Sequence, residues 1–189
     1  MTTNILLLRG PGGSPDKYEA AFSEKQYEPV SIPVLETVLT NVAQLSKLIR
    51  TESGRFAGII ITSARACEAL GKAFEGHFPT WKSPFYVVGK GTAAALRQVF
   101  PDADIRGEDS GNAVPLGRFI LDDLGTSLNR NLLYLTGDKN RDTLPSILTP
   151  SFTLTSLQVY KTTGSPEFPH QLEALKSTGE KSLILVQYI

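Results

Sequence analysis

Short, nearly continuous apolar runs alternate along the chain with stretches in which apolar residues recur every three or four positions. The clearest runs are Ile5–Leu8 and Gly58–Ile61, and a clear periodic stretch carries Ala66, Leu70 and Phe74. Continuous runs of this length are typical of strands buried on both faces of a sheet, whereas the periodic spacing is typical of helices with one buried face. The alternation predicts βαβ units and a mostly parallel sheet, which is an α/β fold.

The predicted elements cover most of the chain. The strands span residues 4–9, 29–35, 57–62, 85–88, 104–106, 131–136, 152–162 and 182–188. Predicted helices span 14–25, 92–100, 113–124, 142–148 and 169–177, and two more begin near the capping residues Asn41 and Ser63. Ligands of open parallel sheets bind beyond the carboxyl ends of the strands. The loops that follow the strands therefore carry the candidate chemistry, and they are 9–13, 62–65, 89–92, 107–112 and 136–141.

The charge balance excludes several classes of partner. Lys and Arg together number 19 among the 189 residues, and Asp and Glu also number 19, so the formal net charge is zero. This balance argues against nucleic-acid binding and against attraction to an anionic membrane surface. The apolar runs are too short to span a bilayer, and the first residues do not resemble a secretion signal. We therefore expect a cytoplasmic protein with no nucleic-acid partner and no membrane attachment.

Residues that commonly bind metals or form covalent intermediates are sparse. Cys67 is the single cysteine, which excludes an internal disulfide, and its place on an apolar helical face favours packing over catalysis. His77 and His170 lie far apart, with no Cys or His at ligand spacing, which argues against a zinc site. Neither a Walker-A loop nor a G-x-S-x-G elbow is present. The sequence thus predicts no metal, no cofactor and no covalent hydrolase chemistry.

Two junctions between a predicted strand and the next helix carry groups suited to an anion. Thr62, Ser63 and Arg65 offer two hydroxyls and a guanidinium beside the backbone N–H groups of a helix start. A helix cap followed by a solvated arginine accounts for the same residues equally well. The glycines of the junction 89–93 let the backbone approach a ligand, although a tight turn with small packing residues is the simpler interpretation.

Weaker signals come from the remaining loops and from one strand residue. Arg9 precedes the glycine-rich loop 10–13, which is either an anion cradle or a flexible turn. Asn112 has the character of a helix cap, and 137–141 that of a charged surface turn. Tyr160 lies near the end of a predicted strand, where a phenol usually packs and is catalytic only if its hydroxyl faces a cleft.

In their joint order and spacing, these segments resemble the uroporphyrinogen-III synthase family. The resemblance covers roughly residues 5–163, and its segments are 5–9, 31–35, 58–69, 86–89, 92–93, 111–113, 137–145 and 159–162. It implies two flavodoxin-like α/β domains, each a parallel sheet with helices on both faces, joined by a two-stranded connection. Domain one would be discontinuous (1–34 and 163–189), and domain two (38–159) would be inserted into it, with the active site in the cleft between them.

The resemblance also implies a reaction. The family closes linear hydroxymethylbilane into uroporphyrinogen III, inverting the last pyrrole ring and losing water, in the pathway to haem. No metal or cofactor is implied, and the expected partner is a polycarboxylated linear tetrapyrrole bound by a monomer. Tyr160 would protonate or hydrogen-bond the leaving hydroxyl. The residues expected to bind the substrate are Arg9, Thr62, Ser63, Arg65, Gly89, Thr92, Ala93, Gly111, Asn112, Gly137 and Arg141.

Two departures from the family pattern qualify the expectation. Ala64 stands where the family often has proline, which is a mild change because proline there mainly rigidifies the helix start. Family members continue beyond the last predicted strand, so we expect a C-terminally truncated member with an incomplete domain one, reduced solubility and an activity left open. The alternatives are a non-catalytic remnant that binds a tetrapyrrole or a protein partner, and an unrelated phosphate- or nucleotide-binding flavodoxin-like module.

Overall fold

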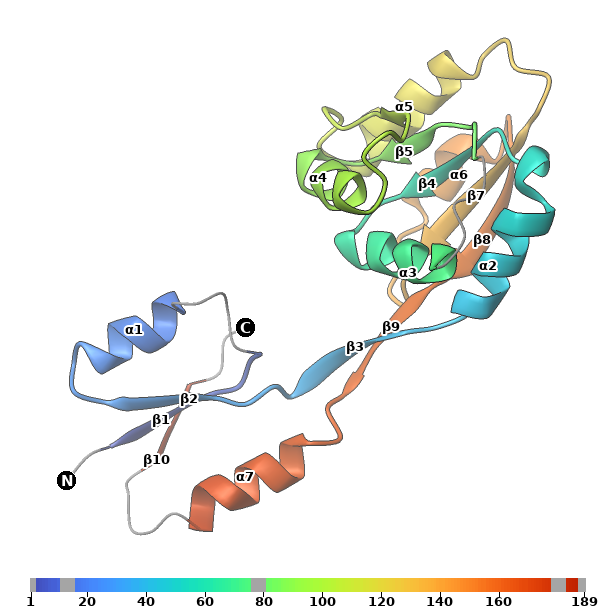
Figure 1. The fold of residues 1–189 in the computed structure, drawn as a ribbon. Helices are drawn as coiled ribbons and strands as arrows, with labels where there is room; N and C mark the ends of the chain where they lie inside the picture. Colours follow the sequence, from blue (N-terminus) through green and yellow to red (C-terminus); the bar gives the residue numbers. More distant parts are fainter. Residues whose placement is uncertain (1–2, 11–15, 76–80, 178–182, 187–189) are drawn as a thin grey trace. The chain divides into compact units, whose positions relative to one another are not determined.

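The computed structural model describes residues 3–10, 16–75, 81–177 and 183–186, and it divides into two compact units (Figure 1). Unit 1 comprises Met1–Thr37 and Thr162–Ile189, and unit 2 comprises Val38–Lys161. Both units contain a parallel sheet and helices, as the sequence pattern predicts. The glycine-rich loop 11–13, the predicted helix start 14–15, His77 and the predicted strand ends 182 and 187–188 lie outside the described residues.

A five-stranded parallel sheet forms the centre of unit 2. Its strands are β4 (Gly58–Ile61), β5 (Phe85–Val87), β6 (Ile105–Arg106), β7 (Asn131–Thr136) and β8 (Thr153–Gln158). They lie in the order β6-β5-β4-β7-β8. β5 and β6 therefore lie on one side of β4, and β7 and β8 lie on its other side. This arrangement is 3-2-1-4-5 in chain order, whereas the flavodoxin order is 2-1-3-4-5. The sheet therefore differs in strand order from the flavodoxin-like sheet expected from the sequence.

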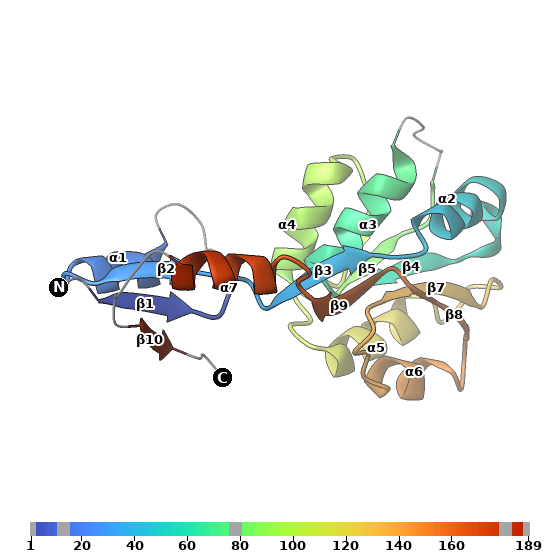
Figure 2. The same ribbon diagram turned by 90° about the horizontal axis from the view of Figure 1, so that it is seen from below.

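Helices cover both faces of this sheet, and Figure 2 shows the two layers. Ile59 and Ile61 of β4 belong to a core cluster with residues from the helices of one face, and Ile60 belongs to a second cluster on the other. All three side chains are fully buried, which explains why β4 has a continuous apolar run rather than an alternating one. The helices of the first face are α2 (Val42–Thr51), α3 (Ala64–Phe74) and α4 (Lys90–Val99), and those of the second are α5 (Ala113–Asp123) and α6 (Thr143–Leu148).

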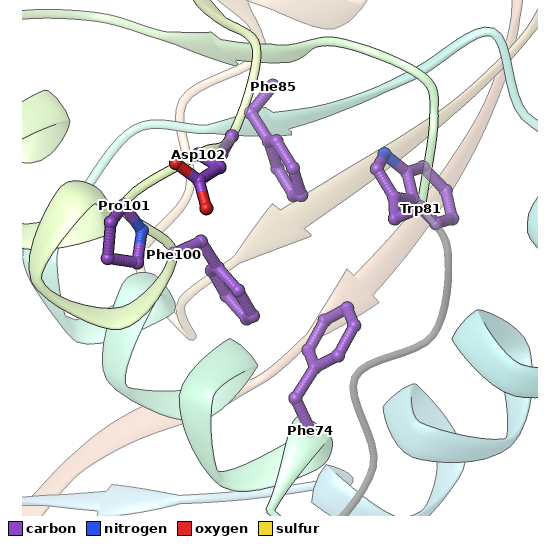
Figure 3. A pocket seen from close by; sticks show the side chains of 7 residues that line it. Phe74, Trp81, Phe85, Phe100, Pro101 and Asp102 are labelled. Carbon is purple, nitrogen blue, oxygen red and sulfur yellow. The ribbon is translucent and has the colours of Figure 1, made fainter.

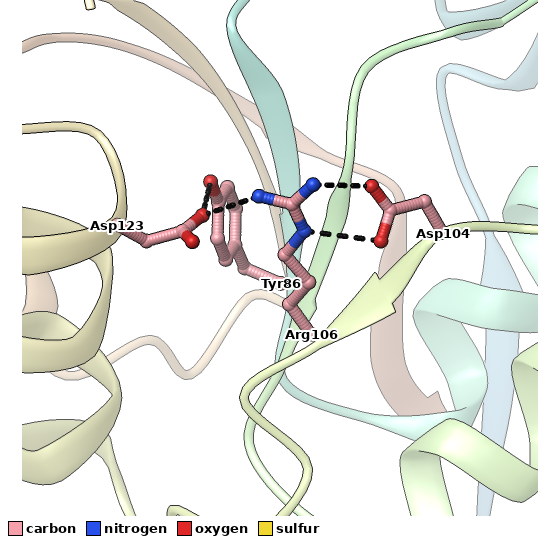
Figure 4. Close-up of polar contacts among 4 residues, drawn as sticks. All are labelled: Tyr86, Asp104, Arg106 and Asp123. Atoms are coloured by element: carbon pink, nitrogen blue, oxygen red, sulfur yellow. Dashed lines mark hydrogen bonds and ion pairs between the residues drawn. The ribbon is translucent and has the colours of Figure 1, made fainter. Parts of the chain in front are cut away.

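A polar network ties α5 to the edge strand β6 (Figure 4). The Tyr86 hydroxyl on β5 donates to Asp123 at 2.6 Å, and the Arg106 guanidinium on β6 donates to the same carboxylate oxygen at 2.8 Å. Arg106 also donates twice to Asp104, at 2.6 and 3.0 Å. Because β6 has only two residues, its short backbone ladder is supplemented by these charge-assisted bonds.

Unit 1 is built on a three-stranded parallel sheet with the order β10-β1-β2. Its described buried apolar side chains are Ile5, Leu6 and Leu7 of β1 and Ile32, which follows β2. Asp16 caps the first helix by accepting from the Tyr18 and Glu19 backbone N–H groups. The elements are β1 (Asn4–Leu7), α1 (Lys17–Ser23), β2 (Glu28–Ser31), α7 (Phe168–Ser177) and β10 (Leu183–Val186).

Two stretches that each read as one strand in the sequence are broken in the structure. The predicted strand 29–35 ends as β2 at Ser31, and a new strand, β3 (Leu35–Leu39), begins after Pro33, which has no N–H to donate to a ladder. The predicted strand 152–162 divides at Val159 into β8 and β9 (Tyr160–Gly164). Val159 donates its N–H to Thr136 at 2.9 Å while its carbonyl accepts from Thr40 at 2.9 Å, so the chain changes pairing partners there. β3 and β9 then pair as a two-stranded sheet.

Candidate functional site

Three helices of unit 2 begin just beyond the carboxyl ends of its strands. The Ser63 hydroxyl caps α3 by accepting from the Ala66 N–H at 3.2 Å, and the Asn112 side chain caps α5 by accepting from the Val114 N–H at 3.1 Å. Both caps confirm what the sequence predicts. Gly89 precedes α4 and provides no side-chain cap. Helix starts of this kind present unpaired backbone N–H groups to an anion.

A hollow of about 230 Å³ lies at this edge of the sheet, between the ends of β4 and β7 where the strand order reverses. Reversal points of this kind are where open α/β sheets bind their ligands. Thr62, which follows β4, and Arg141, in the loop after β7, both line it. The lining residues are Thr62, Val88, Ala113, Tyr134, Lys139, Asn140, Arg141, Thr143 and Leu144.

Tyr134 of β7 contributes a buried phenol to this hollow. Its side chain is 3% exposed, and its hydroxyl donates to the Asn140 Oδ1 at 2.9 Å. Burial raises the pKa of Tyr134. The phenol thus joins β7 to the loop that follows it.

Tyr160, at the start of β9, rests against Gly137 in the same loop. A Cβ atom built at Gly137 would lie 2.5 Å from two carbons of the Tyr160 ring and 2.8 Å from its hydroxyl. Tyr160 is half-buried, and its electrostatic effect adds to that of burial in raising the pKa of Tyr134. Gly137 is required because a side chain there would occupy the space of the ring.

Other predicted site residues have structural roles or lie apart from the hollow. Ala93 is fully buried and its N–H donates to the Gly89 carbonyl at 3.0 Å. Neither the side chain nor the N–H of Ala93 is therefore available to a ligand. Thr92 is 9% exposed, and its carbonyl accepts from the buried Cys67 thiol. Burial raises the pKa of Cys67 to about 11, which disfavours the thiolate. Arg65 is exposed on the first turn of α3.

Arg9 belongs to unit 1, where it is engaged locally. Its guanidinium forms an ion pair with Asp16 at 3.1 Å and lies over the Tyr18 ring at 4.8 Å from the centroid. These contacts join the end of β1 to the start of α1. The structure therefore gives Arg9 a stabilising role within unit 1.

The loop after β6 is fixed by backbone geometry and by two ion pairs. Gly111 has a φ of +70°, a left-handed conformation that favours glycine, and it leads into the cap Asn112. Asp109 pairs with Lys90 at 3.3 Å, and Glu108 pairs with Arg97 at 2.7 Å, both on α4. These largely exposed pairs connect the loop before α5 to α4.

A second hollow, of about 180 Å³, lies at the opposite, amino-terminal edge of the sheet (Figure 3). Phe85, the first residue of β5, stacks on Phe100 with ring centroids 6.0 Å apart, and Phe74 meets Phe100 edge-on at 4.6 Å. Among the described residues that line this hollow, Asp102 is the one with a charge. The aromatic lining and the position at the amino-terminal edge make it a less suitable site for a polycarboxylate.

Three residues that line the first hollow, Tyr134, Lys139 and Asn140, were not predicted as site residues from the sequence. Tyr134 lies within the apolar run Asn131–Thr136, so the run reads as a buried strand and the phenol as packing. Lys139 and Asn140 read as a charged surface turn. The available signal was a tyrosine among the leucines 132, 133 and 135, three residues before the turn at Gly137.

Within the described residues, no group of three or more His, Cys, Asp or Glu side chains is placed to hold a metal ion. No helix in the same part of the chain is both long and apolar enough to cross a membrane.

Comparison with known proteins relates the chain to a family. The family model described as uroporphyrinogen-III synthase HemD matches residues 16–187. The chain is 30% identical over 193 residues to uroporphyrinogen-III synthase from Saccharomyces cerevisiae, covering 93% of this chain and 69% of that protein. It is 28% identical over 144 residues to the Schizosaccharomyces pombe protein of the same name, covering 72% of this chain and 57% of that protein.

Solved structures show the same fold at lower sequence identity. The uroporphyrinogen-III synthetase of Helicobacter pylori aligns with a TM-score of 0.55, and a mutant uroporphyrinogen III synthase of Thermus thermophilus aligns with 0.56. Each is 18% identical to this chain, and each alignment covers 97% of this chain and 72% of the solved one. The family model matches most of the length of this chain, and one relative is 30% identical to it. The chain therefore belongs to the uroporphyrinogen-III synthase family.

Proposed function

We propose that this chain acts as a uroporphyrinogen-III synthase, a lyase that closes hydroxymethylbilane into uroporphyrinogen III with inversion of the last pyrrole ring and release of one water molecule. The observation that carries the proposal is the hollow at the carboxyl edge of the unit 2 sheet, at the point where the strand order reverses. It combines hydroxyl and amide groups with Lys139 and Arg141 in a chain of this family.

The residues of the hollow suit a substrate that carries acetate and propionate groups. Arg141 and the Thr62 hydroxyl line it, and the cap Asn112 adjoins the lining residue Ala113. The starts of α3 and α5 add helix dipoles that favour negative charge. We assign the carboxylates of the bilane to these groups, and the positioning of the reacting ring to the same contacts.

We further propose that the two units correspond to the two domains expected from the sequence. Unit 2 would be the inserted domain, 38–159, and unit 1 the discontinuous domain, 1–34 with 163–189. The support is the division of the chain at Val38 and Thr162 and the pairing of β3 with β9 as a two-stranded connection. A cytoplasmic location and a monomeric state stay predictions, and sedimentation of the purified chain tests the second.

The direct test is the isomer of the product. The chain is given freshly generated hydroxymethylbilane, the products are oxidised, and uroporphyrins I and III are separated. The spontaneous reaction gives isomer I, so isomer III above the protein-free control supports the proposal. Isomer I alone, from a folded chain, contradicts it.

Tyr160 is proposed to donate a hydrogen bond or a proton to the leaving hydroxyl group. Replacing it with phenylalanine keeps the ring against Gly137 and removes the hydroxyl. We expect Tyr160→Phe to lower the rate of isomer III formation about a hundredfold, which is the size typical of one general acid. Tyr27→Phe, a change in unit 1, is the matched control and should retain the rate. Unchanged turnover in Tyr160→Phe would rule out this role.

A further inference from the structure

We propose that Tyr134 is a positioning residue, whose hydroxyl orients the Asn140 side chain so that this amide donates to a substrate carboxylate in the hollow. The inference rests on the proposed function, because the ligand is one carboxylate of the polycarboxylated substrate. It assigns a role to two residues that the resemblance does not name.

The first step is the position of Tyr134 in the sheet. It pairs in register with Ile60 on β4 and belongs to the apolar cluster between the sheet and α5 and α6. A buried phenol is costly unless its hydroxyl is hydrogen-bonded. Its hydroxyl donates to Asn140, which lines the hollow together with Tyr134 and Thr62. The hydroxyl therefore organises the wall of the site.

The second step is the direction of the Asn140 amide. The Tyr134 hydroxyl donates to Oδ1 at 2.9 Å, so the oxygen end of the amide is held toward β7. The opposite end, Nδ2, has no hydrogen-bond partner among the described residues, and Asn140 is exposed in the lining of the hollow. An amide fixed in this way offers two N–H donors and keeps its acceptor turned away.

The third step is the charge around that donor. Lys139 and Arg141 flank Asn140, both are exposed, and both line the hollow. Among the described residues that line it, none is Asp or Glu. Two cations and a directed amide donor select a carboxylate over a neutral or cationic group. If the Tyr134 hydroxyl is lost, the amide is free to turn and can present its oxygen to the carboxylate.

The experiment measures binding apart from turnover. Uroporphyrin III, which carries eight carboxylates of the same two kinds, is titrated with the full chain and its fluorescence anisotropy is followed. We expect Tyr134→Phe to weaken Kd about tenfold, the effect of losing one hydrogen bond to a charged group. We expect the KM for hydroxymethylbilane to rise by a similar factor while kcat stays nearly constant.

Asn140→Ala and the double variant provide the decisive comparison. If Tyr134 acts through Asn140, adding Tyr134→Phe to Asn140→Ala causes no further loss of affinity. Tyr86→Phe removes another buried tyrosine hydroxyl of the same sheet and should leave Kd unchanged. Asn140 is exposed, so Asn140→Ala keeps the test open if Tyr134→Phe does not fold.

Several results would overturn the inference. They are an unchanged Kd in either single variant, additive losses in the double variant, or no binding of uroporphyrin III by the unmodified chain. Failure of the proposed function has a different signature, because the chain would then bind uroporphyrin III and still yield only isomer I.

Discussion

The absence of a side chain at Gly137 shapes the candidate site as much as any functional group. The Tyr160 ring lies where a Cβ atom at Gly137 would stand, at 2.5 Å from two ring carbons. Glycine at this position leaves room for the ring, which lies against the loop that also carries Asn140 and Arg141. The placement of the proposed catalytic hydroxyl thus depends on a residue with no chemistry of its own.

Gly137→Ala should therefore displace Tyr160 and reduce activity. We expect the rate of isomer III formation to fall at least tenfold, because small misplacements of a reacting group are costly. The free energy of unfolding should fall by less, since Tyr160 is half-buried and can move outward. Gly54→Ala is the control, because an added Cβ there meets nothing within 4 Å. Full activity in Gly137→Ala would show that the ring position is unimportant.

At the residue scale, contacts between residues close in the sequence can be predicted, whereas contacts between distant segments cannot. The caps at Ser63 and Asn112 follow from residue type and place in the sequence, and the structure confirms them. Asn41 occupies the N-cap position of α2, as predicted, but its side chain does not cap the helix. Its backbone is left-handed and its amide donates instead to the Gln158 carbonyl at 2.9 Å. The role of Tyr134 likewise depends on partners in other segments.

At the scale of elements, β6 is the weakest part of the unit 2 sheet and the most dependent on side chains. Its two residues pair with β5, and Arg106 connects it to Asp104 and to Asp123 on α5. Burial alone would raise the pKa of Asp123, but hydrogen bonds from Tyr86 and Arg106 and the charge of Arg106 lower it below its ordinary value. The carboxylate is thus stabilised in its charged form.

Asp123→Asn should destabilise unit 2 in a pH-dependent way. We expect the free energy of unfolding near neutral pH to fall by about 1–3 kcal/mol, the range for hydrogen bonds to a charged group. Because the pKa is lower in the folded state, the contribution is present above the ordinary aspartate value of 3.8 and is lost as the pH falls through the lowered value. The difference from the unmodified chain, measured by urea unfolding, should therefore shrink in acid.

Asp122→Asn is the matched control for that prediction. Asp122 is the preceding, exposed residue of α5 and lies outside the network. It should change the free energy of unfolding by only a few tenths of a kcal/mol. A loss in Asp123→Asn that is independent of pH would contradict the assigned role of the charge.

The type and order of the elements follow from periodicity, whereas their breaks do not. The strand predicted over 131–136 matches β7. The breaks at Pro33 and Val159 arise because the chain changes pairing partners there, and the partners lie far away in the sequence. The strand order of the sheet has the same origin, since it is set by which strands meet and not by any one strand.

At the scale of the whole molecule, the described residues of the two units differ in how many apolar side chains they bury. The buried residues of the two core clusters of unit 2 come mainly from β4, β5, β7 and β8 and from α2 to α6, and Ile105 of β6 packs against one cluster. The described buried apolar residues of unit 1 are Ile5, Leu6, Leu7 and Ile32. Neither α1 nor α7 has a fully buried residue in its described part, and Ile184 of β10 is 46% exposed. Unit 1 should consequently open more readily.

Hydrogen exchange should resolve this difference. We expect the amides of β4 and β7 to exchange slowest and those of β1 and β2 to exchange faster, because opening free energies follow the local density of buried contacts. Mass spectrometry of peptides from the exchanged chain measures both sets in one sample. Equal protection of the two sets would show that the units unfold together.

Trp81, which lies beside the aromatic hollow, makes the chain a selective optical reporter. It is the single tryptophan of the sequence, and it belongs to unit 2. Its indole nitrogen is buried with no hydrogen-bond partner among the described residues, and its ring lies 6.1 Å from that of Phe85. Indole emission shifts to longer wavelength when water reaches the ring, so the tryptophan spectrum records the state of unit 2 alone. Tryptophan emission during denaturation does not report on the unfolding of unit 1. The unfolding of unit 1 must be followed by circular dichroism.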